Sequence, residues 1–119
     1  MNKKNIKTFF IVFITILIID IIWINIFAKN KYKKMIRDIQ NEDLKIKIIP
    51  AIIVYIFMTL LFIIFRDKSN TKMFLLGFLT YGVYDMTNYS LLNKFDLKFA
   101  IFDMIWGGVL FLITHNILY

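Results

Sequence analysis

The chain has 119 residues, of which 60% are hydrophobic and 18% aromatic, and its 15 Lys and Arg against 8 Asp and Glu give a net charge of +7. Such a high apolar fraction excludes an ordinary soluble domain. The lack of cysteine excludes disulfides, thiolate nucleophiles and cysteine-ligated metals. The charges gather in short windows that flank long apolar runs. The positive charge therefore indicates contact with lipid headgroups rather than with nucleic acid.

Four apolar runs are long enough to cross a hydrocarbon layer about 30 Å thick, which takes roughly 20 residues of helix. They cover residues 9–27, 48–65, 73–92 and 99–118. None of them alternates between apolar and polar residues as the strands of a membrane barrel do, so helices are the remaining way to pair every backbone amide. The sequence predicts a single integral membrane domain over residues 1–119. This all-α membrane protein would be an antiparallel bundle of four transmembrane helices.

The first run follows the basic stretch MNKKNIK and could be a cleaved signal sequence. Its length, its internal Asp20 and its poor cleavage context argue instead for a retained helix. The segment KNKYKKMIRDIQNEDLKIK, which follows this run, has apolar residues at helical spacing. They predict a short interfacial helix between helices 1 and 2, with its apolar side on the membrane. A solvated charged loop is the alternative.

The later connections, RDKSNTK and KFDLK, are short, so consecutive helices are expected to pack as antiparallel neighbours. The first and third connections together carry nine Lys and Arg, against six in the N-terminal arm and the second connection. This excess favours a cytoplasmic first loop. Three of the six lie in the N-terminal arm, and the first helix often dominates, so the orientation stays open.

Three carboxyl groups lie inside the predicted helices, where an ionisable group costs about 2.5–3.5 kcal/mol on insertion scales. Asp20 and Asp85 each precede the end of their helix by seven residues, and Asp103 follows the start of its helix by four. At a rise of about 1.5 Å per residue, all three lie about 6–11 Å below the same membrane surface. Their shared depth predicts one polar layer.

Other side chains fall at the same depth, including Tyr81, Asp85 and Asn88 on one stripe of the third helix. The polar-layer candidates are Asp20, Trp23, Tyr55, Tyr81, Tyr84, Asp85, Asn88, Asp103 and Trp106. In one interpretation, their hydrogen bonds hold the bundle together. In the other, which uncompensated negative charge favours, the layer handles a cation or a proton. A metal held by the three aspartates is an option, and the sequence identifies no cofactor.

Two of the aspartates belong to Asp-x-x-Trp units on helices that run in opposite directions. This places Trp23 shallower than Asp20, in the interfacial belt, and Trp106 deeper than Asp103, inside the bundle. The glycines of the last two helices predict either close backbone contact between these helices or a dimer interface; they are Gly77, Gly82, Gly107 and Gly108. His115, toward the other end of the last helix, is expected at the interface rather than as a ligand.

The stretch YGVYDMTNYSLLNKFDLKFAIFDMIWGGVL, with DIIW in the first helix and PAIIVY in the second, resembles a family of small membrane proteins, domain of unknown function 2177. The most specific parts are residues 84–88 and 103–107. The resemblance covers nearly the whole chain and implies a four-helix membrane protein. It implies no activity, because the family has none assigned.

Three functions remain open from the sequence. The first is a transport-like protein that handles a cation or proton and needs a homo-oligomer, because four short helices are few for a transport path. The second is an intramembrane lipid-modifying enzyme with a carboxylate-bound divalent metal. The third is a non-catalytic membrane assembly protein whose polar layer only joins helices. Membrane lipid is a predicted partner in each of them.

Overall fold

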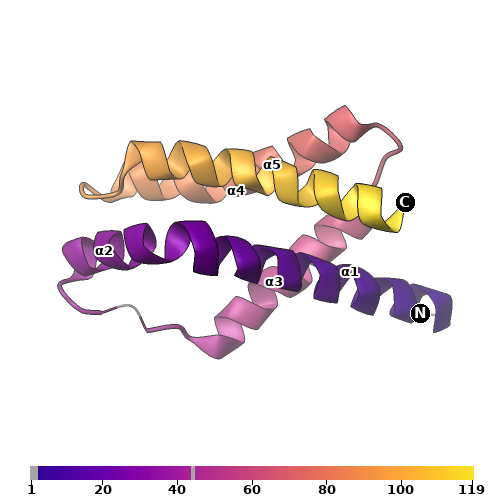
Figure 1. Cartoon of the computed structure of the whole chain (residues 1–119), viewed down its shortest axis with the longest axis horizontal. Coiled ribbons are helices and arrows are strands. Elements are labelled where there is room, and N and C mark those ends of the chain that lie inside the picture. Colours follow the sequence, from indigo (N-terminus) through magenta and orange to yellow (C-terminus); the bar gives the residue numbers. More distant parts are fainter. Residues whose placement is uncertain (1–2, 44) are drawn as a thin grey trace.

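The computed structural model describes residues 3–43 and 45–119, and all of the regular structure in that part of the chain is helical (Figure 1). The elements are α1 (Lys3–Trp23), the π-helical turn η1 (Ile24–Ala28), α2 (Lys29–Gln40), α3 (Ile48–Ile64), α4 (Asn70–Leu91) and α5 (Leu97–Leu118). No strand occurs among the described residues, so the prediction of an all-helical chain is confirmed.

The last two helices begin earlier than the apolar runs that predicted them, because polar residues cap them. Ser69 Oγ accepts the Lys72 N–H at 3.3 Å at the start of α4. Asp96 accepts the Lys98 N–H at 2.9 Å at the start of α5. Each cap pairs a backbone donor that the first helical turn leaves free. The helices therefore extend into the polar connections.

The first helix continues past the end of its apolar run. Residues Lys3–Gln40 form one unbroken helical stretch through η1, which Figure 1 shows as a continuous ribbon. No glycine or proline interrupts it, and it ends where Asn41 adopts a left-handed conformation with φ of 58°. The residues of the predicted interfacial helix are thus helical, but they extend helix 1 and do not turn away as a separate element.

The apolar side of α2 packs on protein. Met35 is buried and forms a cluster with Phe95, in the α4–α5 turn, and Ala100, on α5. The Asp96 N–H also donates to Met35 Sδ at 3.3 Å. The expectation that this side rests on the membrane is therefore wrong, because the turn between α4 and α5 lies close enough to cover it.

Helix α3 packs mainly against α1, which it crosses diagonally in Figure 1. It meets α4 near their connecting turn, where Phe62 and Met73 share the larger core cluster. An open apolar groove of about 350 Å³ also lies between them, lined by Leu61 on α3 and by Leu76, Leu79, Thr80 and Val83 on α4. The expectation that all consecutive helices pack as neighbours is wrong for α3 and α4, because the crossing angle of α3 carries it toward α1.

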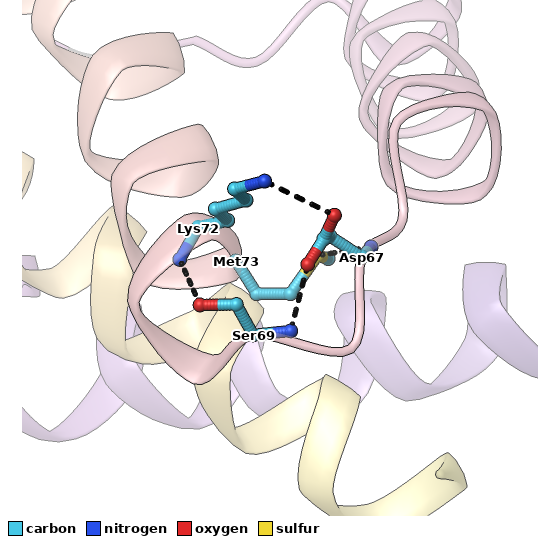
Figure 2. Close-up of polar contacts among 4 residues, drawn as sticks. All are labelled: Asp67, Ser69, Lys72 and Met73. Atoms are coloured by element: carbon cyan, nitrogen blue, oxygen red, sulfur yellow. Dashed lines mark hydrogen bonds and ion pairs between the residues drawn. The ribbon is translucent and has the colours of Figure 1, made fainter.

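The α3–α4 turn is held by the polar contacts shown in Figure 2. Asp67 accepts the Ser69 N–H at 2.8 Å and lies 3.5 Å from Lys72 Nζ, while its own N–H donates to Met73 Sδ at 3.3 Å. The Ser69 N–H, assisted by the Lys72 ammonium, holds the pKa of Asp67 below its ordinary value of 3.8. The carboxylate therefore keeps the charge that orders this turn down to acidic pH.

Helices α4 and α5 form the most extensive interface of the described residues, and glycines allow their close approach. A Cβ atom on Gly77 would lie 2.1 Å from the carbonyl oxygen of Gly107, and one on Gly108 would lie 2.6 Å from the Phe74 ring. No side chain fits at these distances. The predicted close contact between the last two helices is therefore confirmed.

Two helical stretches of the described chain are long and apolar enough to cross a membrane, Lys3–Gln40 and Leu97–Leu118. Helix α3 is apolar but has only 17 residues. Helix α4 has 22 residues but a lower hydropathy, because polar residues such as Asp85 and Asn88 interrupt its apolar sequence. Length and composition thus identify two candidate spans among the four expected ones.

Candidate functional site

A buried carboxylate on α1 joins all four of the long helices. Asp20 is 6% exposed and accepts hydrogen bonds from the hydroxyl groups of Tyr55 on α3, at 2.5 Å, and Tyr81 on α4, at 3.2 Å. The indole N–H of Trp106 on α5 donates to the same carboxylate at 2.8 Å. Three donors from three helices therefore satisfy one acceptor residue, here called the Asp20 cluster.

The local sequence of α1 explains the position of Asp20. Val12, Ile16 and Asp20 follow one another at four-residue spacing and are all buried, so they form the stripe that faces the other helices. A carboxylate on this stripe must point into the protein. There it needs hydrogen-bond donors, because an unpaired buried charge is strongly destabilising.

The two Asp-x-x-Trp units interlock at this point. The rings of Trp23 and Trp106 stack with centroids 4.7 Å apart and planes within 7° of parallel. They therefore lie at one depth, and the expectation that they lie at different depths is wrong. That expectation counted Cα positions, whereas side chains lean toward the N-terminus of their own helix. Because α1 and α5 are antiparallel, the two rings lean toward each other.

The other two aspartates, Asp85 and Asp103, lie on α4 and α5. Asp85 is 0% exposed, and neither of its carboxylate oxygens has a hydrogen-bond partner among the described residues. It interacts electrostatically with the half-buried Asp103 on α5. The buried N–H of Trp23 also interacts with Asp103 and makes no hydrogen bond of standard geometry. The Asp85 carboxyl group and the Trp23 N–H, both without a hydrogen-bond partner, thus lie beside the carboxyl group of Asp103.

The remaining candidates of the third helix lie outside these two groups. Tyr84 is 51% exposed, and its hydroxyl lies 3.2 Å from that of Tyr32 on α2. Asn88 is half-buried, and its backbone carbonyl accepts the Leu92 N–H at 2.8 Å. The sequence does not identify Tyr32 as a site residue, because Tyr32 lies in the charged segment after the first apolar run. It reaches α4 because α2 continues α1 without a break.

His115 is buried near the C-terminal end of α5, with its ring centroid 6.1 Å from that of Tyr119. It belongs to the opposite end of α5 from Asp103, as the sequence predicts. Only 8% of the residue is accessible, and its Nδ1 has no hydrogen-bond partner among the described residues.

The chemistry around the carboxylates is unlike that of a metal centre. Tyr55, Tyr81 and Trp106 all direct hydrogens toward Asp20, and the Trp23 N–H faces Asp103. Cation sites instead need several oxygen acceptors that point at one position. The described residues include no group of three or more His, Cys, Asp or Glu side chains arranged to hold a metal ion.

The comparisons with known proteins agree with the resemblance seen in the sequence. A family model described as a predicted membrane protein, DUF2177, matches residues 5–117. No curated protein and no solved structure matches the chain. The match covers almost the whole sequence and the helices that supply the aspartates. The chain therefore belongs to the family of predicted membrane proteins with domain of unknown function 2177.

Proposed function

We propose that the chain is one multi-pass membrane domain in which α1, α3, α4 and α5 each cross the bilayer. Apolar side chains are exposed on all four helices, as expected of surfaces in contact with lipid. On α4, which has the most polar sequence of the four, Leu75, Leu79 and Val83 form an exposed stripe at four-residue spacing. The 17 residues of α3 meet the lower limit of length for a spanning helix.

The absence of cysteine allows a direct test of this topology. Single cysteines at Lys45, before α3, and at Lys68, after it, are expected to react with an impermeant maleimide from opposite sides of sealed membrane vesicles. Labelling of both positions from the same side would contradict a spanning α3. A cysteine at Asp43, on the same loop as Lys45, serves as the control and should label like Lys45.

Within this domain, the function that the geometry supports best is the handling of a proton by Asp85 and Asp103. The observation that carries it is the fully buried Asp85 carboxyl group with no hydrogen-bond partner beside a second carboxyl group. Two adjacent carboxylates without a counter-ion are costly in a low dielectric. A proton bound to Asp85 would turn it into a donor to Asp103, which then also receives the Trp23 N–H.

The donors around the site favour a proton over a metal cation as its occupant. An N–H that points at Asp103 stabilises negative charge there and repels a cation. The described residues around Asp85 and Asp103 supply no Lys, Arg or His as a counter-ion. A proton shared by Asp85 and Asp103 removes one negative charge. It also gives the Asp85 carboxyl group a hydrogen-bond partner and leaves Asp103 as the acceptor for the Trp23 N–H.

The difference in exposure between the two carboxyl groups gives the site a direction. Asp103 is half-buried, whereas both carboxylate oxygens of Asp85 are buried, so a proton that reaches Asp85 would pass through Asp103. A proton that moves between them passes from an accessible to an inaccessible position, as in a relay. Because one chain offers few helices for a complete path, this relay works within a homo-oligomer.

Asp85→Asn is expected to abolish proton movement, because an amide can neither bind nor release a proton at neutral pH. The protein is reconstituted into liposomes that contain a pH-sensitive dye, and a valinomycin-clamped potassium gradient drives protons inward. The wild-type protein should acidify the lumen, and Asp85→Asn and Asp103→Asn should reduce the rate at least tenfold. The exposed Asp43→Asn provides the control and should transport like the wild type.

Infrared spectroscopy tests the proton site independently of transport. The wild-type protein should show the C=O stretch of a protonated carboxylic acid, and Asp85→Asn should lose it. The proposal is wrong if the folded wild-type protein lacks this band and transports no protons. It is also wrong if Asp85→Asn keeps both the band and the flux.

The Asp20 cluster favours a second candidate, a non-catalytic assembly function. Its carboxylate is fully paired with three donors and joins four helices, as expected of a structural group. If assembly were the whole function, Asp85→Asn and Asp103→Asn would alter stability and leave the cellular function intact. Loss of function in well-folded forms of both variants would exclude this candidate.

A further inference from the structure

A groove opens beside the Trp23–Trp106 stack, between the α1–α2 helix and the start of α5. Its volume is about 720 Å³, which lies within the usual range for small-molecule sites. The walls come from α1, η1, α2, the α4–α5 turn and α5. Its lining residues include four lysines and four large aromatic residues, namely Lys31, Lys34, Lys94, Lys98, Trp23, Phe27, Phe99 and Phe102.

The polarity of the groove changes in the same direction along both walls. On the α1–α2 wall, Lys34 and Lys31 are followed toward α1 by Phe27 and Trp23. On the α5 wall, which runs the other way, Lys98 is followed one turn later by Phe102. The four lysines therefore lie at the end near the connecting turns, together with Phe99, and Trp23, Phe27 and Phe102 lie at the other end.

The lysines of the groove are free to bind an anion. In the part of the chain that the structure describes, the ion pairs join Arg37 to Asp43 and Lys72 to Asp67, and neither involves a groove lysine. Two aspartates also line the groove, and one of them, Asp96, is engaged as the cap of α5. Four ammonium groups against two carboxylates leave a net positive charge at the outer end.

We propose that this groove binds one anionic phospholipid, with the phosphate headgroup among Lys31, Lys34, Lys94 and Lys98 and an acyl chain against Trp23, Phe27 and Phe102. The inference goes beyond the proton site and does not depend on it. Cationic residues above apolar ones match the two ends of a phospholipid, and basic pockets between membrane helices recognise such headgroups. A free phosphate would use only the lysines and leave the aromatic end empty.

Tryptophan fluorescence tests this proposal, because Trp23 lines the proposed acyl-chain end. The whole protein is placed in phosphatidylcholine nanodiscs that contain a small fraction of phosphatidylglycerol, with bromine on the acyl chains of one lipid or the other. At equal mole fraction, brominated phosphatidylglycerol should quench more strongly than brominated phosphatidylcholine. Soluble glycerol 3-phosphate should not reverse this quenching, since it lacks the acyl chain.

Paired variants distinguish the groove from the general charge of the surface. Lys31→Gln with Lys34→Gln, or Lys94→Gln with Lys98→Gln, should lower the preference for phosphatidylglycerol by about 10- to 30-fold. The matched control is Lys45→Gln with Lys47→Gln, which removes the same charge from an exposed segment outside the groove. It should keep most of the preference.

Three outcomes would overturn the proposal. Equal quenching by the two brominated lipids would show no anion preference, and full competition by glycerol 3-phosphate would show a site for free phosphate instead. An equal loss in the control variant and the groove variants would show that only surface charge matters. All the substituted lysines are exposed, so we expect the helices of each variant to stay intact. Circular dichroism of each variant verifies this.

Discussion

Gly77→Ala is expected to destabilise the protein by about 3 kcal/mol or to prevent its folding. The added methyl group would lie 2.1 Å from the Gly107 carbonyl oxygen and 2.9 Å from Phe111 Cβ. Backbone atoms cannot move aside as a flexible side chain can, so α4 and α5 would have to separate. The separation would also pull Tyr81 and Trp106 away from Asp20. The measurement is the free energy of unfolding in mixed micelles titrated with sodium dodecyl sulfate.

Gly82→Ala is the matched control, because it adds the same methyl group to the same helix. Its nearest neighbour would be the end of the Met104 side chain at 3.3 Å, which can rotate away. We expect a change of less than about 1 kcal/mol. Alanine has the higher helix propensity, so propensity alone would stabilise both variants. Similar losses in the two variants would therefore show that the close contact at Gly77 does not decide the effect.

Asp20→Ala is expected to cost about 3 kcal/mol or more, because it removes the acceptor of three hydrogen bonds at once. Each buried donor left without a partner costs about 1–3 kcal/mol. The hydroxyl groups of Tyr55 and Tyr81 and the indole N–H of Trp106 would all be left unpaired. The same unfolding titration measures the loss, and the near-ultraviolet circular dichroism of the tryptophan stack should weaken.

Asp20→Asn should be milder, at about 1 kcal/mol, because its amide oxygen can still accept the bonds from Tyr81 and Trp106. Tyr84→Phe is the control for loss of a tyrosine hydroxyl, since the exposed Tyr84 hydroxyl pairs with that of Tyr32 and not with a buried carboxylate. It should change stability by no more than about 0.5 kcal/mol. If Asp20→Ala were as mild as Tyr84→Phe, the Asp20 cluster would not hold the helices together.

Most of the helical structure could be predicted from the sequence. Four long apolar runs without strand-like alternation require helices, and the end of α3 differs from its predicted position by one residue. The starts of α4 and α5 were missed because the capping residues Ser69 and Asp96 lie outside the apolar runs. The continuation of α1 into α2 was not predicted, because a charged segment usually marks the end of a membrane helix. This charged segment nevertheless contains no residue that breaks a helix.

The candidate site was predictable in its composition but not in its pairing. Asp20, Asp85 and Asp103 can be identified because each is costly in an apolar run. Depth alone cannot tell that Asp20 receives three donors while Asp85 receives none, since this depends on which helix faces which. The lysine-lined groove could not be predicted, because its walls come from segments more than fifty residues apart in the sequence.

The sequence by itself determined that this chain is helical and that it belongs in a membrane. It also identified the few ionisable residues whose burial in apolar helices costs free energy. Hydrophobicity and backbone hydrogen bonding decide these properties, and both act locally along the chain. Only the tertiary structure decided that Trp23 stacks on Trp106, that Asp20 is saturated and that Asp85 is left beside Asp103. Those outcomes depend on the crossing of α3, the glycine contact between α4 and α5 and the lean of each side chain, which are properties of the packed helices together.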